Sequence, residues 1–202
     1  RVLDEFTFRC GSLGIKSATS LAVGDVGAQV VERSRWVDMV VINQRRVHGR
    51  WAERPLGTIF QTVAEQAMCP ILAVPGTRVL PLRRVVLAYD GSPKAREALF
   101  VFTHLARCWK VGGVILTVAG GRADRDELDR AWQYTQQAGA TVVETRYEEG
   151  QAGAVIMRVM EEEGAELLLM GGYGYQPLLK AFLGSTVDRV LREAWFPVLI
   201  CR

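Results

Sequence analysis

The sequence predicts an α/β protein built on a doubly wound parallel sheet. Short apolar runs, typical of buried strands, alternate with helix-spaced apolar patterns along residues 84–202. Several of these runs are almost entirely apolar, as expected of parallel strands covered on both faces. Alternation of this kind favours a parallel sheet with right-handed crossovers. A third observation is that a segment from the first half of the chain recurs near its end.

The second half of the chain is expected to hold five strands and four helices. Ser92 suits a helix N-cap and Pro93 the first helical position, whereas Gly139 and Gly164 each end a helix. The expected strands cover residues 84–89, 114–118, 141–147, 167–170 and 197–201, and the helices cover 93–109, 124–138, 152–163 and a segment opening at 184–186.

The first half is expected to hold a shorter version of this pattern. A helix within residues 1–17 would place Leu3, Phe6 and Cys10 on one face, and Asp25 would cap the next helix. The remaining expected elements are strands at 16–23, 37–42 and 70–74, helices at 26–35 and 57–68, and a linker at 75–81.

An internal repeat links the two halves. Residues 57–74 match residues 184–201, and Gly184 follows Gly57 by the same 127 positions that separate Pro197 from Pro70. We therefore expect a partial first copy over residues 1–78, lacking its opening strand–helix–strand, and a complete copy over 82–202.

Composition excludes several classes of function. The chain has 202 residues, a net charge of +3 and 49% hydrophobic residues, with no dense basic block for nucleic acid or an anionic membrane. No apolar run reaches the length of a membrane span, and the start lacks a signal-peptide layout, so we expect a cytoplasmic protein. The four cysteines are scattered and are expected to be reduced packing residues. Two histidines offer little for a zinc site or a catalytic triad.

The candidate site begins where the strand at 167–170 runs into a glycine cluster at Gly171, Gly172 and Gly174. Gly184, Ser185 and Thr186 then open a helix. Glycine lets the main chain approach an anion closely, and a helix N-terminus offers free N–H groups, so this arrangement can grip phosphates. The alternative is a strand-to-helix turn in which Ser185 is an N-cap and no ligand binds.

These residues resemble a known family. The glycine pattern resembles the nucleotide-binding motif of the universal stress protein family, in the order Gly171-x-x-Gly174, nine further residues and Gly184-Ser185. Two other segments are also similar to that family, namely Asp90-Gly-Ser and residues 190–200. The resemblance covers residues 84–202 in full and 20–75 in part. It implies a flavodoxin-like sheet of five parallel strands, a tendency to dimerise and, in tandem members, two copies in one chain.

The resemblance also implies a ligand. Nucleotide-binding members hold ATP, usually with a divalent metal such as Mg or Mn, between the ends of the first and fourth strands, and open α/β sheets bind ligands at such ends. By position, Asp90 would contact the ribose, and Ala88 and Val118 would line the adenine pocket. Met170 and Gly171 would pass beneath the ribose and phosphates. The phosphates would be held by Gly174, Gly184, Ser185 and Thr186. Tyr173 and Tyr175 would either stack on the ligand or fill the site.

The first copy is expected to bind no nucleotide. Asn43 and Arg46 stand opposite the two glycines of the second copy, and only Gly57 and Thr58 remain of the motif. Side chains there would crowd the approach of phosphate to the main chain. We therefore expect the first copy to act as a packing partner.

The leading hypothesis is an ATP-binding stress-response protein that acts by binding or signalling, with slow ATP hydrolysis at most. No Gly-x-x-x-x-Gly-Lys-Ser/Thr loop is present. The alternative is a nucleotide-free interaction module whose last strand, 197–201, pairs with a partner strand, which residues 70–74 can supply; a homo-oligomer is also expected. A third hypothesis, a hydrolase or transferase with Ser185 as nucleophile, is opposed by the lack of a nearby His or Lys base and of a Gly-x-Ser-x-Gly elbow.

Overall fold

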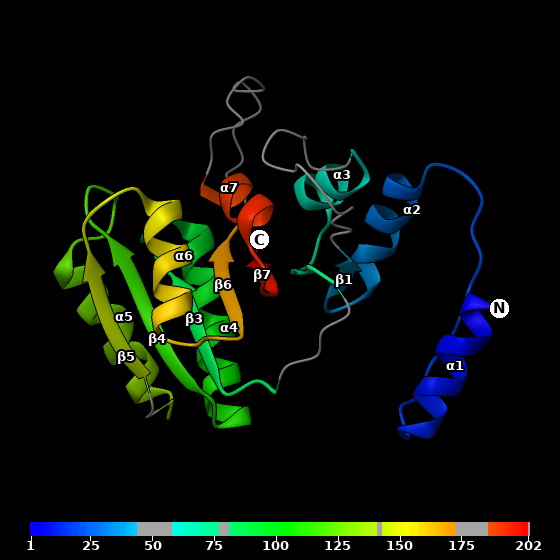
Figure 1. The fold of residues 1–202 in the computed structure, drawn as a ribbon, viewed down its shortest axis with the longest axis horizontal. Helices are drawn as coiled ribbons and strands as arrows, with labels where there is room; N and C mark the ends of the chain where they lie inside the picture. The colour runs from blue at the N-terminus through cyan, green and yellow to red at the C-terminus, as the bar shows by residue number, and fades with distance from the viewer. Residues whose placement is uncertain (44–57, 77–80, 141–142, 173–185, 202) are drawn as a thin grey trace.

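The computed structural model describes residues 1–43, 58–76, 81–140, 143–172 and 186–201. Seven strands form one sheet in the order β1-β2-β7-β6-β3-β4-β5, with helices on both faces (Figure 1). Every neighbouring pair is parallel except β2 and β7, which are antiparallel. The α/β class predicted from the sequence is confirmed.

The second half has the predicted alternation of five strands and four helices. Its elements are β3 (Arg84–Ala88), α4 (Pro93–Trp109), β4 (Gly112–Val118), α5 (Arg125–Gln137), β5 (Val143–Glu148), α6 (Ala152–Glu162), β6 (Leu167–Gly171), α7 (Thr186–Glu193) and β7 (Val198–Cys201). Ser92 caps α4 by accepting a hydrogen bond from the amide of Ala95, and Pro93 opens the helix, as expected. Gly139 and Gly164 have φ of 85° and 57°, so both lie in the left-handed region that ends a helix.

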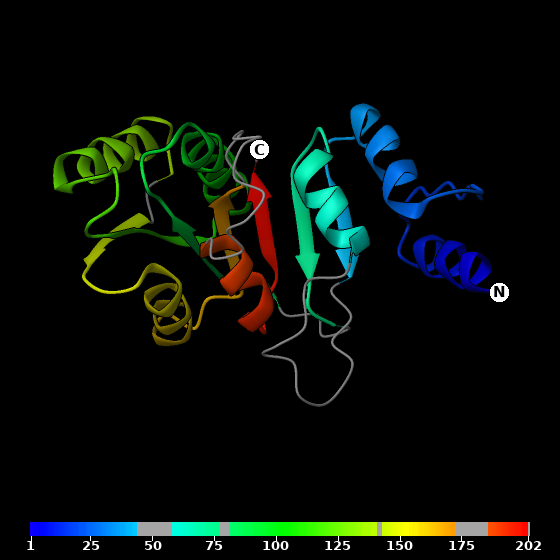
Figure 2. The same cartoon turned by 90° about the horizontal axis from the view of Figure 1, so that it is seen from above.

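Strands β7, β6, β3, β4 and β5 form the predicted flavodoxin-like parallel sheet. Figure 2 shows α4 and α5 on one face and α6 and α7 on the other. Each face has its own core, because successive strand residues point to opposite sides. Val86 and Leu168 face α6 and α7, whereas Leu87 and Leu169 face α4 and α5.

The first half contributes α1 (Val2–Ser12), α2 (Val26–Arg33), the 3₁₀ helix η1 (Ser34–Trp36), β1 (Val40–Asn43), α3 (Thr58–Gln66) and β2 (Ile71–Val74). Asp25 caps α2 as predicted, accepting a hydrogen bond from the amide of Ala28. Helix α1 also forms, but none of its residues is buried, and Figure 1 shows it set apart from the sheet. Leu3 and Phe6, which were expected to share one face of this helix, are 44% and 51% exposed.

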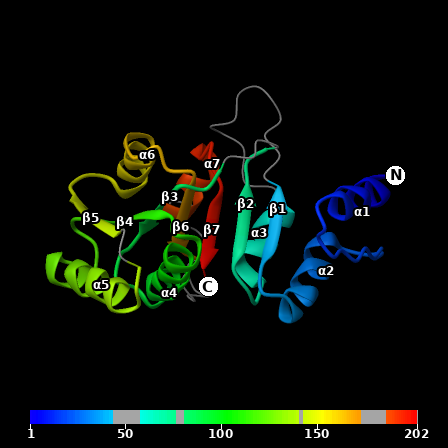
Figure 3. The same ribbon diagram turned by 90° about the horizontal axis from the view of Figure 1, so that it is seen from below.

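The two halves meet at β2 and β7. Ile71 pairs with Ile200, Leu72 with Leu199 and Ala73 with Val198. Helices α3 and α7 lie on the same face of this junction (Figure 3), and their side chains belong to one apolar cluster. The prediction that 70–74 pairs with the last strand is confirmed, whereas the division into copies at 1–78 and 82–202 stays a prediction.

One strand prediction in the first half is wrong, and the bounds of another differ from those expected. Residues 16–23 form no strand, and Leu21 and Val23 are 86% and 92% exposed. A strand needs a neighbour to pair its N–H and C=O groups, and β1 is the last strand on this side of the sheet. The strand expected at 37–42 is β1 and is covered on one face only. Its burial alternates, and Val41 on the open face is 61% exposed.

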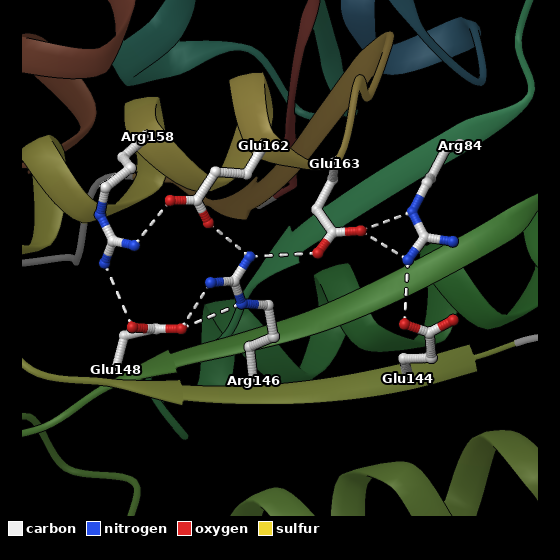
Figure 4. A network of polar contacts seen from close by, with 7 residues as sticks. All are labelled: Arg84, Glu144, Arg146, Glu148, Arg158, Glu162 and Glu163. Carbon is white, nitrogen blue, oxygen red and sulfur yellow. Dashed lines mark hydrogen bonds and ion pairs between the residues drawn. The ribbon is translucent and has the colours of Figure 1, made fainter.

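The opposite edge of the sheet, β5, carries charges where β3 and β4 carry apolar residues. Glu144, Arg146 and Glu148 pair in register with Val114, Leu116 and Val118, so they face the α6 side of the sheet. They join a network of ion pairs shown in Figure 4, whose members are Arg84, Glu144, Arg146, Glu148, Arg158, Glu162 and Glu163. Charged side chains of this kind discourage another strand from adding to an edge.

Candidate functional site

The carboxyl ends of β3 and β6 lie side by side in the middle of the parallel sheet. Ala88 of β3 pairs with Met170 of β6 on one side and with Leu116 of β4 on the other. The chain leaves β3 toward β4 and later returns to β3 through β6, so the strand order reverses at this point. Ligands of open α/β sheets bind at such a reversal.

Asp90 lies on the short turn between β3 and α4. Its side chain is exposed, and its Oδ1 accepts a hydrogen bond of 3.0 Å from the amide of Ser92. Gly91 between them has φ of 73°, which glycine adopts without strain. Asp90 therefore caps this turn, and the hydrogen bond holds its exposed carboxylate next to the carboxyl end of β3.

A buried tyrosine holds the main chain just before Asp90. The hydroxyl of Tyr89 donates a 2.8 Å hydrogen bond to Oε1 of Glu127 on α5, which also accepts from Arg96 on α4 at 3.2 Å. Arg130 donates to the other carboxylate oxygen at 3.0 Å. The turn that carries Asp90 is thus tied to both helices of this face.

The same contacts shift the pKa values of the group. The hydrogen bond from Tyr89, followed by those from Arg130 and Arg96, holds the pKa of Glu127 below its usual range. Burial, together with the carboxylate of Glu127, raises the pKa of Tyr89. Glu127 therefore keeps its charge and Tyr89 its proton. No local pattern in the sequence indicates this pair, because Tyr89 occupies an apolar strand position and its partner lies on a distant helix.

Ala88 and Val118 lie where the resemblance expects an adenine pocket. Both are half-buried and pack against the apolar cluster on the α6 and α7 side of the sheet. Met170 belongs to the same cluster and is buried. Ala88, Val118 and Met170 therefore lie on one face of three strands, near their carboxyl ends.

Gly171 and Gly172 are both in close contact with neighbouring main chain. A Cβ at Gly171 would lie 2.8 Å from the amide nitrogen of Ala95 and 2.8 Å from the carbonyl carbon of Lys94. A Cβ at Gly172 would lie 2.9 Å from the carbonyl oxygen of Cys201. Both glycines thus have a packing reason, and Gly171 allows the N-terminus of α4 to approach the end of β6.

Thr186 is the first residue of α7 and is half-buried. The remaining predicted phosphate contacts, Gly174, Gly184 and Ser185, lie outside the described residues, as do Tyr173 and Tyr175. The described part of the chain contains no group of three or more His, Cys, Asp or Glu side chains able to hold a metal ion.

The corresponding positions of the first half are different. Asn43 is the last residue of β1, and its side-chain amide donates a 3.4 Å hydrogen bond to the carbonyl of Gly76. Strand β1 is parallel to β2, and β2 is antiparallel to β7. The carboxyl end of β1 therefore points in the opposite direction along the strands from the carboxyl ends of β3 and β6. Arg46 and Gly57 lie outside the described residues, and Thr58 begins α3.

The fold and the residues at the ends of β3 and β6 define a doubly wound α/β protein of the flavodoxin-like type. The model of the universal stress protein family matches residues 101–202, half of the chain. The chain therefore belongs to the universal stress protein family. None of the described helices is long and apolar enough to cross a membrane.

Known proteins support this assignment. The chain is similar to a universal stress protein of Synechocystis, with 27% identity over 170 residues that cover 82% of this chain and 58% of the relative. It thus spans less than two thirds of that relative. A universal stress protein from Archaeoglobus fulgidus DSM 4304 has the same fold, with a TM-score of 0.84 and 23% identity over 100% of this chain and 74% of its own.

A second solved structure is a universal stress protein in complex with cAMP. It has a TM-score of 0.52 and 26% identity, and covers 59% of this chain and 96% of its own.

Proposed function

We propose that this protein binds an adenine nucleotide at the carboxyl ends of β3 and β6. The observation that carries the proposal is that β3 and β6 are neighbours at the reversal of strand order, with the exposed carboxylate of Asp90 at one end and Gly171 at the other. A relative of the same family has been solved with cAMP, which contains adenine and ribose. ATP, with Mg²⁺ or Mn²⁺ on its phosphates, is the proposed ligand.

The described residues fit the adenosine part of this ligand. Asp90 presents a carboxylate that can accept hydrogen bonds from ribose hydroxyls, and Ala88 and Val118 are small apolar residues on the adjoining strand ends. Two helix N-termini face the carboxyl ends of these strands. One is the first turn of α4, which lies close to Gly171, and the other is the start of α7 at Thr186. The phosphates are assigned to Gly174, Gly184, Ser185 and Thr186. The protein would act by binding or signalling in the cytoplasm.

Isothermal titration with ATP and with cAMP tests the proposal. The wild type is compared with Gly174→Val, in which a branched side chain would occupy the path of the phosphates. Gly11→Val is the matched control, because a Cβ at Gly11 meets nothing within 4 Å. We expect one site per chain, with weaker ATP binding in Gly174→Val only. Equal ATP affinity in all three proteins would contradict the proposal, and two sites would contradict a nucleotide-free first copy.

A nucleotide-free interaction module is the second candidate. It is favoured by one observation, that Gly171 and Gly172 are both required by packing against α4 and β7. The two candidates differ in what the purified protein carries. Heating the protein and measuring adenine absorbance in the extract would reveal a retained nucleotide. Light scattering after size exclusion would test the expected homo-oligomer.

A further inference from the structure

Tyr89 comes directly before the proposed ligand contact Asp90, and β4 holds both polar groups of its main chain. The amide of Tyr89 donates a 2.8 Å hydrogen bond to the carbonyl of Leu116. Its carbonyl accepts a 2.9 Å hydrogen bond from the hydroxyl of Thr117. Thr117 is only 1% exposed, so water does not compete for this contact. The main chain is therefore fixed at the residue from which the turn begins.

Helix α5 holds the same turn through Glu127. The carboxylate of Glu127 accepts the 2.8 Å hydrogen bond from the buried hydroxyl of Tyr89. The stem of this side chain lies close to Gly91, where a Cβ would be 3.5 Å from Cγ of Glu127 and 3.3 Å from Cβ of Ala123. Glu127 is therefore next to the residues on both sides of Asp90, and little room is left for the turn to shift toward α5.

The two carboxylate oxygens of Asp90 have different surroundings. Oδ1 accepts the hydrogen bond from the amide of Ser92, whereas Oδ2 accepts none from the part of the chain that the structure describes. Oδ2 is thus the oxygen that can accept a hydrogen bond from a ligand. A group that is already held in its binding position gives a tighter complex than one that must be ordered by the ligand.

We propose that Tyr89 and Glu127 are positioning residues that fix the carboxylate of Asp90 for the ribose hydroxyls of the nucleotide. The inference rests on the proposed function, because it requires the ribose to lie at Asp90. In this role neither side chain contacts the ligand, since Tyr89 is 3% exposed and its hydroxyl already donates to Glu127. The pair acts by restricting the turn before the nucleotide arrives.

The test measures recognition of the ribose and not affinity alone. Isothermal titration gives the dissociation constants of ATP and of 2′,3′-dideoxy-ATP, which lacks both ribose hydroxyls, for the full chain as wild type and as variants. The wild type should bind ATP roughly tenfold more tightly than the analogue, as expected for hydrogen bonds to a charged group. This preference should fall by roughly threefold in Tyr89→Phe and in Glu127→Ala, because both remove the hydrogen bond that restricts the turn.

Two further variants separate positioning from general loss of stability. Glu127→Gln keeps a side-chain oxygen that can accept from Tyr89, so it should retain the wild-type preference. Trp132→Phe removes another hydrogen bond of α5, the 2.9 Å contact of the indole N–H with the carbonyl of Val143 on β5. It should lower the stability measured by thermal unfolding and leave the preference unchanged.

The outcomes distinguish this inference from the proposed function. If the wild type prefers ATP and both Tyr89→Phe and Glu127→Ala keep that preference, the inference is overturned and the proposed function stands. An equal fall in Trp132→Phe would also overturn it, because any lost contact of α5 would then suffice. So would a wild type that binds ATP and the analogue equally well. A wild type that binds no ATP would overturn the proposed function and this inference together.

Discussion

At the scale of single residues, Gly171 shows how one position serves packing and a site together. The backbone of α4 approaches it so closely that a Cβ would lie 2.8 Å from Ala95 N. The sequence singles out this glycine as a ligand contact, but it could not show the packing neighbour, since the first turn of α4 is far away in the chain. The proposed ligand and the observed helix contact both require a residue without a side chain at position 171.

Replacing Gly171 by alanine is expected to destabilise the fold by about 1–3 kcal/mol, because the extra methyl overpacks against main chain that cannot rotate away. Gly112→Ala is the control, since a Cβ there would meet only ordinary contacts at 3.5 Å or more. Urea unfolding of both variants measures the effect. Equal midpoints for the two would show that α4 does not approach β6 this closely.

Asp90 allows the turn and the ligand to be separated. In Asp90→Asn, the side-chain oxygen can still accept the hydrogen bond from the amide of Ser92, so the stability should not change. The charged acceptor is lost, so ATP binding should weaken by roughly ten- to a hundredfold, the range for hydrogen bonds to charged groups. Calorimetry and thermal unfolding measure the two quantities.

Ser92→Ala is the matching control for this prediction. It removes the cap of α4, which is expected to cost about 1 kcal/mol of stability. Its effect on ATP affinity should be smaller than that of Asp90→Asn. If both variants lose stability and affinity together, Asp90 acts only through the turn.

At the scale of elements, the sequence predicted strands and helices well where a neighbour exists to pair or cover them. Helices α4 and α5 begin at the capping residues Ser92 and Asp124, which are local signals. Residues 16–23 have the composition of a strand but no partner, and β1 has a helix layer on one face only. Pairing and coverage are properties of the assembled sheet, so no local pattern reveals them.

The network on β5 and α6 predicts an acid-dependent stability. Hydrogen bonds from Arg146 and then Arg158 hold the pKa of Glu148 below its usual range, and the same two arginines, Arg158 first, lower the pKa of Glu162. Both carboxylates therefore stabilise the fold above a pH of about 4.5. This stabilisation is lost as the pH falls through the lowered values.

Arg146→Met should accordingly be less stable than wild type at pH 7, by about 1–2 kcal/mol for a partly buried network. The difference should shrink as the pH falls below about 4.5 and through the lowered pKa values of the two glutamates, where they take up protons. Urea midpoints between pH 7 and pH 3 measure it. Arg9→Met, which removes the exposed pair with Glu5, is the control and should change little. A gap that is independent of pH would mean that Arg146 acts through packing alone.

At the scale of the whole molecule, the antiparallel contact of β2 with β7 makes one sheet from two parallel parts. Ile71 and Ala73 of β2 and Val198 and Ile200 of β7 belong to one apolar cluster with α3 and α7. The sequence predicted this meeting of strands because the last strand, short and apolar, needs a partner that residues 70–74 can supply. The core that they share implies that opening β2 also exposes β7.

Hydrogen exchange measured by mass spectrometry tests this coupling. Ile71→Ala removes a side chain that is 2% exposed, and it is expected to cost about 2–5 kcal/mol as the core loses contacts. Exchange should accelerate in β2 and also in β7, while β4 and β5, on the far side of β3, change less. Ile59→Ala on α3 is the control, because Ile59 is exposed. If β7 keeps its protection when β2 opens, the two parts of the sheet unfold independently, and the first half contributes no stability to the strand next to β6.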